Sequence, residues 1–345
     1  MRGELYLLKK ITMGKSVETE SKSRWELWKY FARRYSIQLS VFGVLLVLFA
    51  IFILVRPKVF LAYDIYFAFM SSIPFTAISA LALTLVVIAG EIDLSFPSVM
   101  GFGGWVFTNL FLITGNVGLA LAGCLVVGSL IGACNGLLVT KVRIPSLIAT
   151  IGTMYLWRGI LMILCGGRGT PLVAAKETVL YYALVGRLPW HRIPIQAVWT
   201  VVIAVGLWFL LNRHKFGLRV YHVGDSTTSS RMMGINVDRI KIITFMQMGF
   251  FATFAGVLAS LEVRYLWPTL GSGYLIKVVA AVFVGGTSIS GGEGTLLGTF
   301  IGVIIIGCLE AGIIAMGMTG FWTQAVYGAV IVMSLSFYSF IRRGG

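Results

Sequence analysis

Long apolar runs recur along the chain, and they limit the folds open to it more than any other feature. Most are close to the ~20 residues that an α-helix needs to cross a ~30 Å hydrocarbon core, and none alternates as a barrel strand would. The runs lie at about residues 38–55, 66–89, 98–113, 117–140, 145–165, 195–211, 242–261, 274–289, 295–317 and 322–341. We therefore expect an all-α integral membrane protein with about ten transmembrane helices.

Composition supports this class and suggests a simple domain organisation. The 345 residues are 58% hydrophobic and only 12% charged, whereas a soluble domain is about 25% charged. We expect a polar N-terminal arm at 1–37, which lies on the membrane surface, followed by a transmembrane permease domain at 38–342. The first apolar run begins only at Gln38 and is long enough to span, so it predicts a retained helix and no cleaved signal peptide. Met1 and Met13 both remain possible translation starts.

The net charge of +15 is explained by its distribution. If the N-terminus is cytoplasmic and ten spans alternate, nineteen Lys and Arg residues fall inside, eight fall outside, and Arg158 lies within a span. This excess follows the positive-inside rule, so both termini are expected to be cytoplasmic. Attraction to anionic membrane lipid accounts for the basic surface, and no nucleic-acid partner is expected.

Two of the apolar runs carry glycines at every fourth position. Such small-residue stripes allow neighbouring helices in a membrane to approach closely. The glycines are Gly128, Gly132 and Gly136 in the fourth run and Gly294, Gly298 and Gly302 in the ninth. Both runs are therefore expected to be buried against other helices.

The segment GEIDLSFPS, residues 90–98, places two acids at the junction of two apolar runs. Ser95 followed by Pro97 indicates a helix start. Acids at membrane depth are costly unless they are paired or hydrated. Glu91, Asp93 and Ser95 therefore have two possible roles: orienting the turn in the inner headgroup region, or forming a gate or ion pair on a transport pathway.

A second interruption is GGTSISGGEG, residues 285–294. From Tyr274 to Val284 the preceding run has eleven residues, which give roughly 17 Å of helix against a ~30 Å core. The helix must therefore break, and glycine permits the positive φ angles and close packing that a break requires. The expected hinge residues are Gly285, Gly286, Gly291, Gly292 and Gly294.

The connection at 212–241 is the largest one expected on the cytoplasmic side. Within it, the sequence predicts a short helix from Ser226 to Met233, capped by Asp225 or Ser226 and ended by Gly234. Paired methionines give this helix an apolar knob. The helix either lies on the membrane surface or docks into a groove of another protein.

Taken together, these motifs resemble those of permease subunits in ribose-type ATP-binding cassette sugar importers. The resemblance covers about residues 38–340 and rests on GEIDLS at 90–95, GIN at 234–236 and GYLIKVVAAVFVGGTSISGGEG at 273–294. It implies that the short helix is the coupling helix that contacts the ATPase. The implied coupling residues are Gly224, Asp225, Ser226, Thr227, Thr228, Ser229, Arg231, Met232, Met233 and Gly234.

Three departures from the family pattern leave the cargo open. Thr228 and Ser229 replace two alanines, the segment 275–277 is Leu-Ile-Lys where Glu-Leu-Asp is typical, and Glu91, Phe96 and Pro97 replace Gly, Val and Gly. The binding protein also makes most of the selection in such systems. Ribose, xylose, another monosaccharide, a sugar-like signal and a nucleoside all remain possible cargoes.

The resemblance also implies the partners and the compartment. Two permeases, identical or paralogous, would form a dimer around a pathway in a bacterial or archaeal plasma (inner) membrane, with an extracytoplasmic sugar-binding protein outside and ATPase subunits inside. ATP hydrolysis would reside in those subunits, because the chain has no GxxxxGK[ST] phosphate loop. No catalytic residue, metal or cofactor is expected. An ion-coupled secondary transporter of a small polar solute is the alternative.

Overall fold

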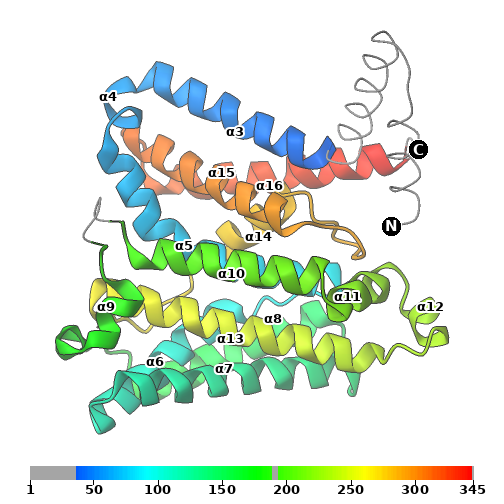
Figure 1. Ribbon diagram of the computed structural model, residues 1–345, viewed down its shortest axis with the longest axis horizontal. Coiled ribbons are helices and arrows are strands. Elements are labelled where there is room, and N and C mark those ends of the chain that lie inside the picture. Colours follow the sequence, from blue (N-terminus) through cyan, green and yellow to red (C-terminus); the bar gives the residue numbers. More distant parts are fainter. Residues whose placement is uncertain (1–35, 189–192, 344–345) are drawn as a thin grey trace, which may run out of the picture.

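The computed structural model describes residues 36–188 and 193–343, and the fold is almost entirely helical (Figure 1). Within these residues, eight helices are long and apolar enough to cross a bilayer. They are α3 (Ser36–Val55), α5 (Tyr63–Ile88), α6 (Phe96–Thr114), α7 (Val117–Thr140), α8 (Ser146–Cys165), α10 (Ile195–Asn212), α13 (Val237–Val263) and α15 (Leu296–Ala315). The expected N-terminal arm, with both possible start residues, falls outside the described residues except for its last two positions.

Two further helices complete the pattern of apolar runs. α14 (Tyr274–Val284) has eleven residues, as the sequence predicts, and α16 (Gly320–Arg343) has 24. Each of the ten expected runs therefore contains a helix among the described residues, and the prediction of an all-α membrane protein is confirmed. The chain is a multi-pass membrane protein.

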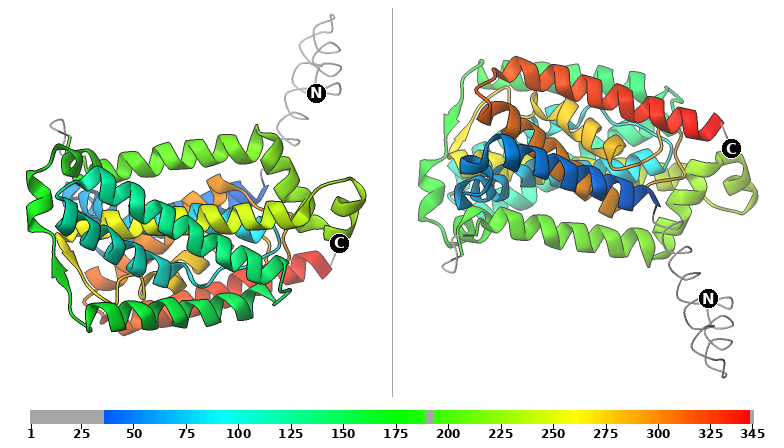
Figure 2. Two further views of the ribbon diagram at one scale, coloured as in Figure 1. Left: turned by 90° about the horizontal axis from the view of Figure 1, so that it is seen from below. Right: turned by 90° about the horizontal axis from the view of Figure 1, so that it is seen from above.

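The short elements gather at the two ends of the helix bundle (Figure 1). One end carries α4 (Pro57–Phe60), η1 (Val173–Glu177), α9 (Val179–Val185) and the antiparallel pair β1 (Thr170–Pro171) and β2 (Tyr265–Leu266). The other end carries α11 (Lys215–Asp225) and α12 (Thr227–Met232). Both views in Figure 2 show the long helices running side by side between these ends.

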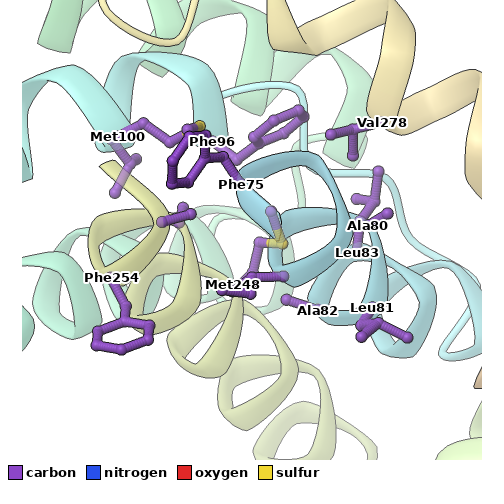
Figure 3. Close-up of a cluster of buried hydrophobic side chains, with 14 of the residues drawn as sticks. Phe75, Ala80, Leu81, Ala82, Leu83, Phe96, Met100, Met248, Phe254 and Val278 are labelled. Carbon is purple, nitrogen blue, oxygen red and sulfur yellow. The ribbon is translucent and has the colours of Figure 1, made fainter. Parts of the chain in front are cut away.

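α5 forms the centre of the bundle. Every residue from Pro74 to Ile88 is buried, and the helix packs against α10, α13, α14 and α15. A helix that is apolar all round must be enclosed by other elements, as this half of α5 is. Figure 3 shows Met100 of α6 and Met248 of α13 in the same buried cluster.

The predicted glycine stripes lie at close contacts between helices. A Cβ atom added to Gly132 of α7 would lie 2.1 Å from the Phe245 carbonyl oxygen of α13, and one added to Gly302 of α15 would lie 2.3 Å from the Ala281 carbonyl oxygen of α14. Neither contact leaves room for a side chain. The prediction is wrong for Gly294, which precedes α15 in a non-helical segment.

The connection at 212–241 contains one helix more than the sequence analysis predicts. α11 precedes the coupling helix, and the His214 side chain caps it by accepting a hydrogen bond from the Phe216 amide at 3.1 Å. Gly217, Val220 and Val223 form its buried face at helical spacing. This spacing is the signal that could have identified α11.

Candidate functional site

Three motifs that are far apart in the sequence meet at one point of the structure. Gly90 follows α5, Gly224 lies in the last turn of α11, and Gly291 and Gly292 belong to the glycine-rich segment. A Cβ added to Gly224 would lie 1.7 Å from the Ile88 carbonyl oxygen and 2.5 Å from the Gly292 amide nitrogen. We call this contact of the backbones at Gly90, Gly224, Gly291 and Gly292 the glycine junction.

Hydrogen bonds hold the glycine junction together. The Gly292 amide donates to the Ile88 carbonyl oxygen at 2.9 Å, and the Tyr221 hydroxyl donates to the Gly294 carbonyl oxygen at 2.8 Å. The first bond joins the glycine-rich segment to the end of α5, and the second joins it to α11. The glycine-rich segment is therefore hydrogen-bonded both to α5 and to α11.

The glycine-rich segment breaks the helix where the sequence predicts it. α14 ends at Val284, and Gly286, Gly291 and Gly292 have φ angles of 83°, 81° and 73°. Residues that carry a side chain rarely adopt this backbone conformation. Gly285 has an ordinary φ angle but packs against α15, where an added Cβ would lie 2.6 Å from Thr299 Cα. Positive φ angles and tight packing thus explain different glycines of the segment.

The predicted coupling helix is α12, which projects from the end of the bundle (Figure 1). Of the two predicted caps the structure uses Ser226, whose Oγ accepts a hydrogen bond from the Ser229 amide at 3.2 Å. Gly234 follows the helix with a φ angle of 75°. Met232 and Met233 are 77% and 58% exposed. Most of the predicted coupling residues are likewise exposed: Asp225, Thr227, Thr228, Ser229, Arg231 and Gly234.

The acidic turn after α5 has a partner for each of its two acids. Glu91 forms an ion pair with Lys241 of α13, with Oε1 and Nζ 2.5 Å apart and both side chains largely buried. Asp93 is buried, and its Oδ1 accepts hydrogen bonds from the Ser95 amide and hydroxyl at 2.8 and 2.6 Å. Asn135 of α7 donates in turn to Ser95 Oγ at 2.7 Å. The turn is therefore tied to two neighbouring helices.

The Asp93 carboxyl has a raised pKa because burial removes it from water, although the hydrogen bonds from Ser95 act in the opposite direction. Its two bonds from Ser95 have the character of a cap on the turn that begins α6. This geometry fits the orienting role foreseen for the turn. It leaves the gating role a proposal.

Arg158 is a site residue to which the sequence analysis gives no role. Its guanidinium reaches from α8 and donates to three backbone carbonyl oxygens, those of Pro97, Pro268 and Leu270, at 2.7 to 2.9 Å. The last two belong to the non-helical segment between β2 and α14. A basic residue in the middle of an apolar run is the signal that could have pointed to this contact.

The helical bundle, the projecting α12 and the break after α14 describe a polytopic membrane protein. The family model described as "Branched-chain amino acid transport system / permease component" matches residues 65–335. The chain belongs to this family. Its membership favours a permease component of a transport system over an ion-coupled secondary transporter.

Curated relatives cover nearly the whole chain. The ribose import permease protein RbsC of Escherichia coli strain K12 is 32% identical over 308 residues, which are 89% of this chain and 95% of the relative. RbsC of Haemophilus influenzae is 30% identical over 88% of this chain and 93% of its own. The autoinducer 2 import system permease protein LsrC of Klebsiella pneumoniae is 31% identical over 86% and 84%. No solved structure matches the chain significantly.

Proposed function

We propose that this chain is the membrane-spanning subunit of an ATP-driven importer for a monosaccharide or a closely similar solute. The relatives named for ribose and autoinducer 2 support this class of cargo. An extracytoplasmic binding protein delivers the solute, and partner ATPase subunits drive the cycle. The subunit itself performs no covalent chemistry.

The glycine junction is the observation that carries the proposal, because it joins the docking helix to the break in the transmembrane domain. α12 presents Met232 and Met233 to a partner, and the coupling residues lead back from it to Gly224. Gly224 touches the glycine-rich segment and the end of α5 without an intervening side chain. Movement of the ATPase under α12 would therefore act directly on the hinge glycines Gly285 to Gly294.

Alternating access requires two states with different affinities for the partners. In our proposal the hinge glycines change their backbone angles between these states, while the acidic turn acts as a gate. Glu91 and Lys241 would separate when α13 moves relative to α5, because the pair is the charged contact between them. Asp93 and Ser95 would keep the start of α6 fixed during this movement.

The proposal includes a topology and an assembly. The end of the bundle that carries α11 and α12 faces the cytoplasm, as do both termini, because that end carries the excess of basic residues. A second permease, a copy or a paralogue, completes the pathway, and membrane lipid surrounds the dimer.

A charge placed on the methionine knob tests the docking role of α12. We expect the Met232→Asp, Met233→Asp double variant to insert in the membrane and to bind the loaded binding protein. It should lose association with the ATPase, since burying an unpaired carboxylate in an apolar contact costs several kcal/mol. Co-purification of the ATPase and binding-protein-stimulated ATP hydrolysis are the measurements.

Val142→Asp is the matched control. Val142 is 62% exposed and lies in the connection between α7 and α8 at the same end of the bundle, outside α12. This variant should keep the ATPase. Unchanged association and transport in the methionine variant would show that α12 does not dock, and the importer mechanism would lose its main support.

A further inference from the structure

A cavity of about 430 Å³ opens between α4, α5, α14 and α15. Its size falls within the range of about 300–1,000 Å³ that is typical of small-molecule sites. Most of its wall is apolar, and Ser72, Thr76, Tyr274, Lys277 and Glu310 supply the polar groups. It lies toward the end of the bundle that carries α4, away from α12.

An ion pair forms one side of the cavity. Lys277 Nζ of α14 donates to both carboxylate oxygens of Glu310 of α15, at 2.6 and 2.7 Å. Lys277 lies in the first turn of α14. Glu310 lies five residues before the end of α15, or about 8 Å along the helix. Both charges are therefore within the helical bundle.

The exposure of this pair indicates what covers the cavity. The Lys277 and Glu310 side chains are 26% and 33% exposed. Charged groups within a membrane protein face water or other protein groups, because contact with lipid tails is costly. A neighbouring cavity of about 500 Å³ between α3, α5, α10 and α15 has no charged residue in its lining, as expected of a wall that faces lipid. The lining of the cavity with the ion pair is therefore that of a wall that faces water or another protein group.

We propose that this cavity is a binding site for a neutral polyhydroxylated solute on the translocation pathway, with Lys277 and Glu310 as the recognition groups. The ammonium has three donors and uses two on Glu310, so one remains for a solute hydroxyl oxygen. The carboxylate keeps lone pairs for solute hydroxyl protons. Ser72 donates to the Ala68 carbonyl oxygen and can still accept.

The apolar wall and the charge balance narrow the class of solute. Phe69 and Tyr274 offer surfaces for the C–H face of a sugar ring. The two charges sum to zero, so the cavity provides no net charge to compensate a desolvated ion. The site therefore favours a neutral solute, such as a sugar, over an inorganic ion or another solute with a net charge. This inference rests on the proposed importer function and assigns the place where the cargo is recognised within the membrane.

Cysteine labelling tests the aqueous cavity without reference to any cargo. In a chain whose four native cysteines are replaced by alanine, Ser72→Cys should react with a small charged, membrane-impermeant thiol reagent. The matched control is Val201→Cys on α10, which is 53% exposed beside the uncharged cavity. We expect at least about tenfold faster reaction at position 72, equivalent to about 1.4 kcal/mol of easier access from water. Equal rates would overturn the proposal, because the cavity would then face lipid or be sealed by a second copy.

Transport by the complete system tests recognition. With D-ribose as the probe, saturating cargo should slow labelling of Ser72→Cys, and Glu310→Gln should lower uptake by about tenfold, as loss of a charge-assisted hydrogen bond predicts. Co-purification of Glu310→Gln with the ATPase subunits should show that the variant is folded and assembled. Wild-type uptake in this variant together with unprotected labelling would refute a recognition site. Failure of the wild type to import D-ribose would instead count against the proposed cargo, while the labelling ratio would still test the cavity.

Discussion

We expect the addition of one methyl group at Gly224 to lower both the stability of the permease and its coupling to the ATPase. Its Cβ would lie 1.7 Å from the Ile88 carbonyl oxygen, and ordinary contact begins at 3.4 Å. The obstructing atoms belong to the backbone, so no side-chain rotation can relieve the overlap. The three segments of the glycine junction must move apart in the Gly224→Ala variant.

Overpacking of this kind costs about 1–3 kcal/mol, occasionally more. We expect Gly224→Ala to reach at least the upper part of this range, because the required displacement is large compared with the few tenths of an ångström that packed neighbours can give. The thermal unfolding of the purified permease measures the stability. Binding-protein-stimulated ATP hydrolysis by the complete transporter measures the coupling, which should fall further than the stability because the junction connects α12 to the break.

Two control variants separate overlap from backbone effects. Gly206→Ala lies within α10 with nothing within 4 Å of the added atom, so it should be neutral or stabilising by about 0.5–1 kcal/mol. Gly90→Ala has room for the methyl group, with 3.6 Å to Gly224, but a φ angle of 80°; it should show strain of about 1–2 kcal/mol. If Gly224→Ala matches Gly206→Ala in both stability and coupling, the tight packing at the junction has no energetic importance.

Two further predictions concern topology and the helix break. Glu177→Cys and Thr228→Cys, both at exposed positions at opposite ends of the bundle, should react with an impermeant reagent only from opposite faces of the membrane; reaction from the same face would contradict the ten-span arrangement. Gly286→Leu and Gly291→Leu should impair uptake far more than Ile289→Leu, because both glycines have positive φ angles and Ile289 is exposed. Normal uptake by both glycine variants would mean that the segment is an ordinary loop.

The parts of the structure that follow local rules could be predicted from the sequence. The long apolar runs predict the long helices. The glycines that begin at Gly285 predict the end of α14, and Ser226 and Gly234 predict the two ends of α12. Each of these features depends on residues within a few positions of one another. The sequence analysis does not predict α11, because the helix is largely polar and its buried face consists of only a few residues.

Contacts between distant segments could not be predicted in the same way. Gly90, Gly224 and Gly292 each belong to a motif that the sequence analysis identifies. Their contact with one another depends on how α5, α11 and α14 pack. Lys277 and Glu310 are 33 residues apart and lie on different helices. No local pattern in a single sequence indicates that two such distant positions are in contact. The ion pair and the cavity beside it are therefore visible only in the structure.

Arg158 is a residue that stands out in the sequence and whose contacts in the structure follow from a general rule of membrane folding. Backbone carbonyl groups inside a bilayer must find donors, so a non-helical segment at this depth needs protein groups to satisfy it. The segment before α14 has no helical bonds to offer Pro268 and Leu270, and the Arg158 guanidinium supplies the donors from α8. A guanidinium suits the task because its five N–H groups are fixed in a plane and can serve several acceptors at once. The cost of a basic residue within an apolar run is thereby offset by the hydrogen bonds that Arg158 donates to the carbonyl groups of this non-helical segment.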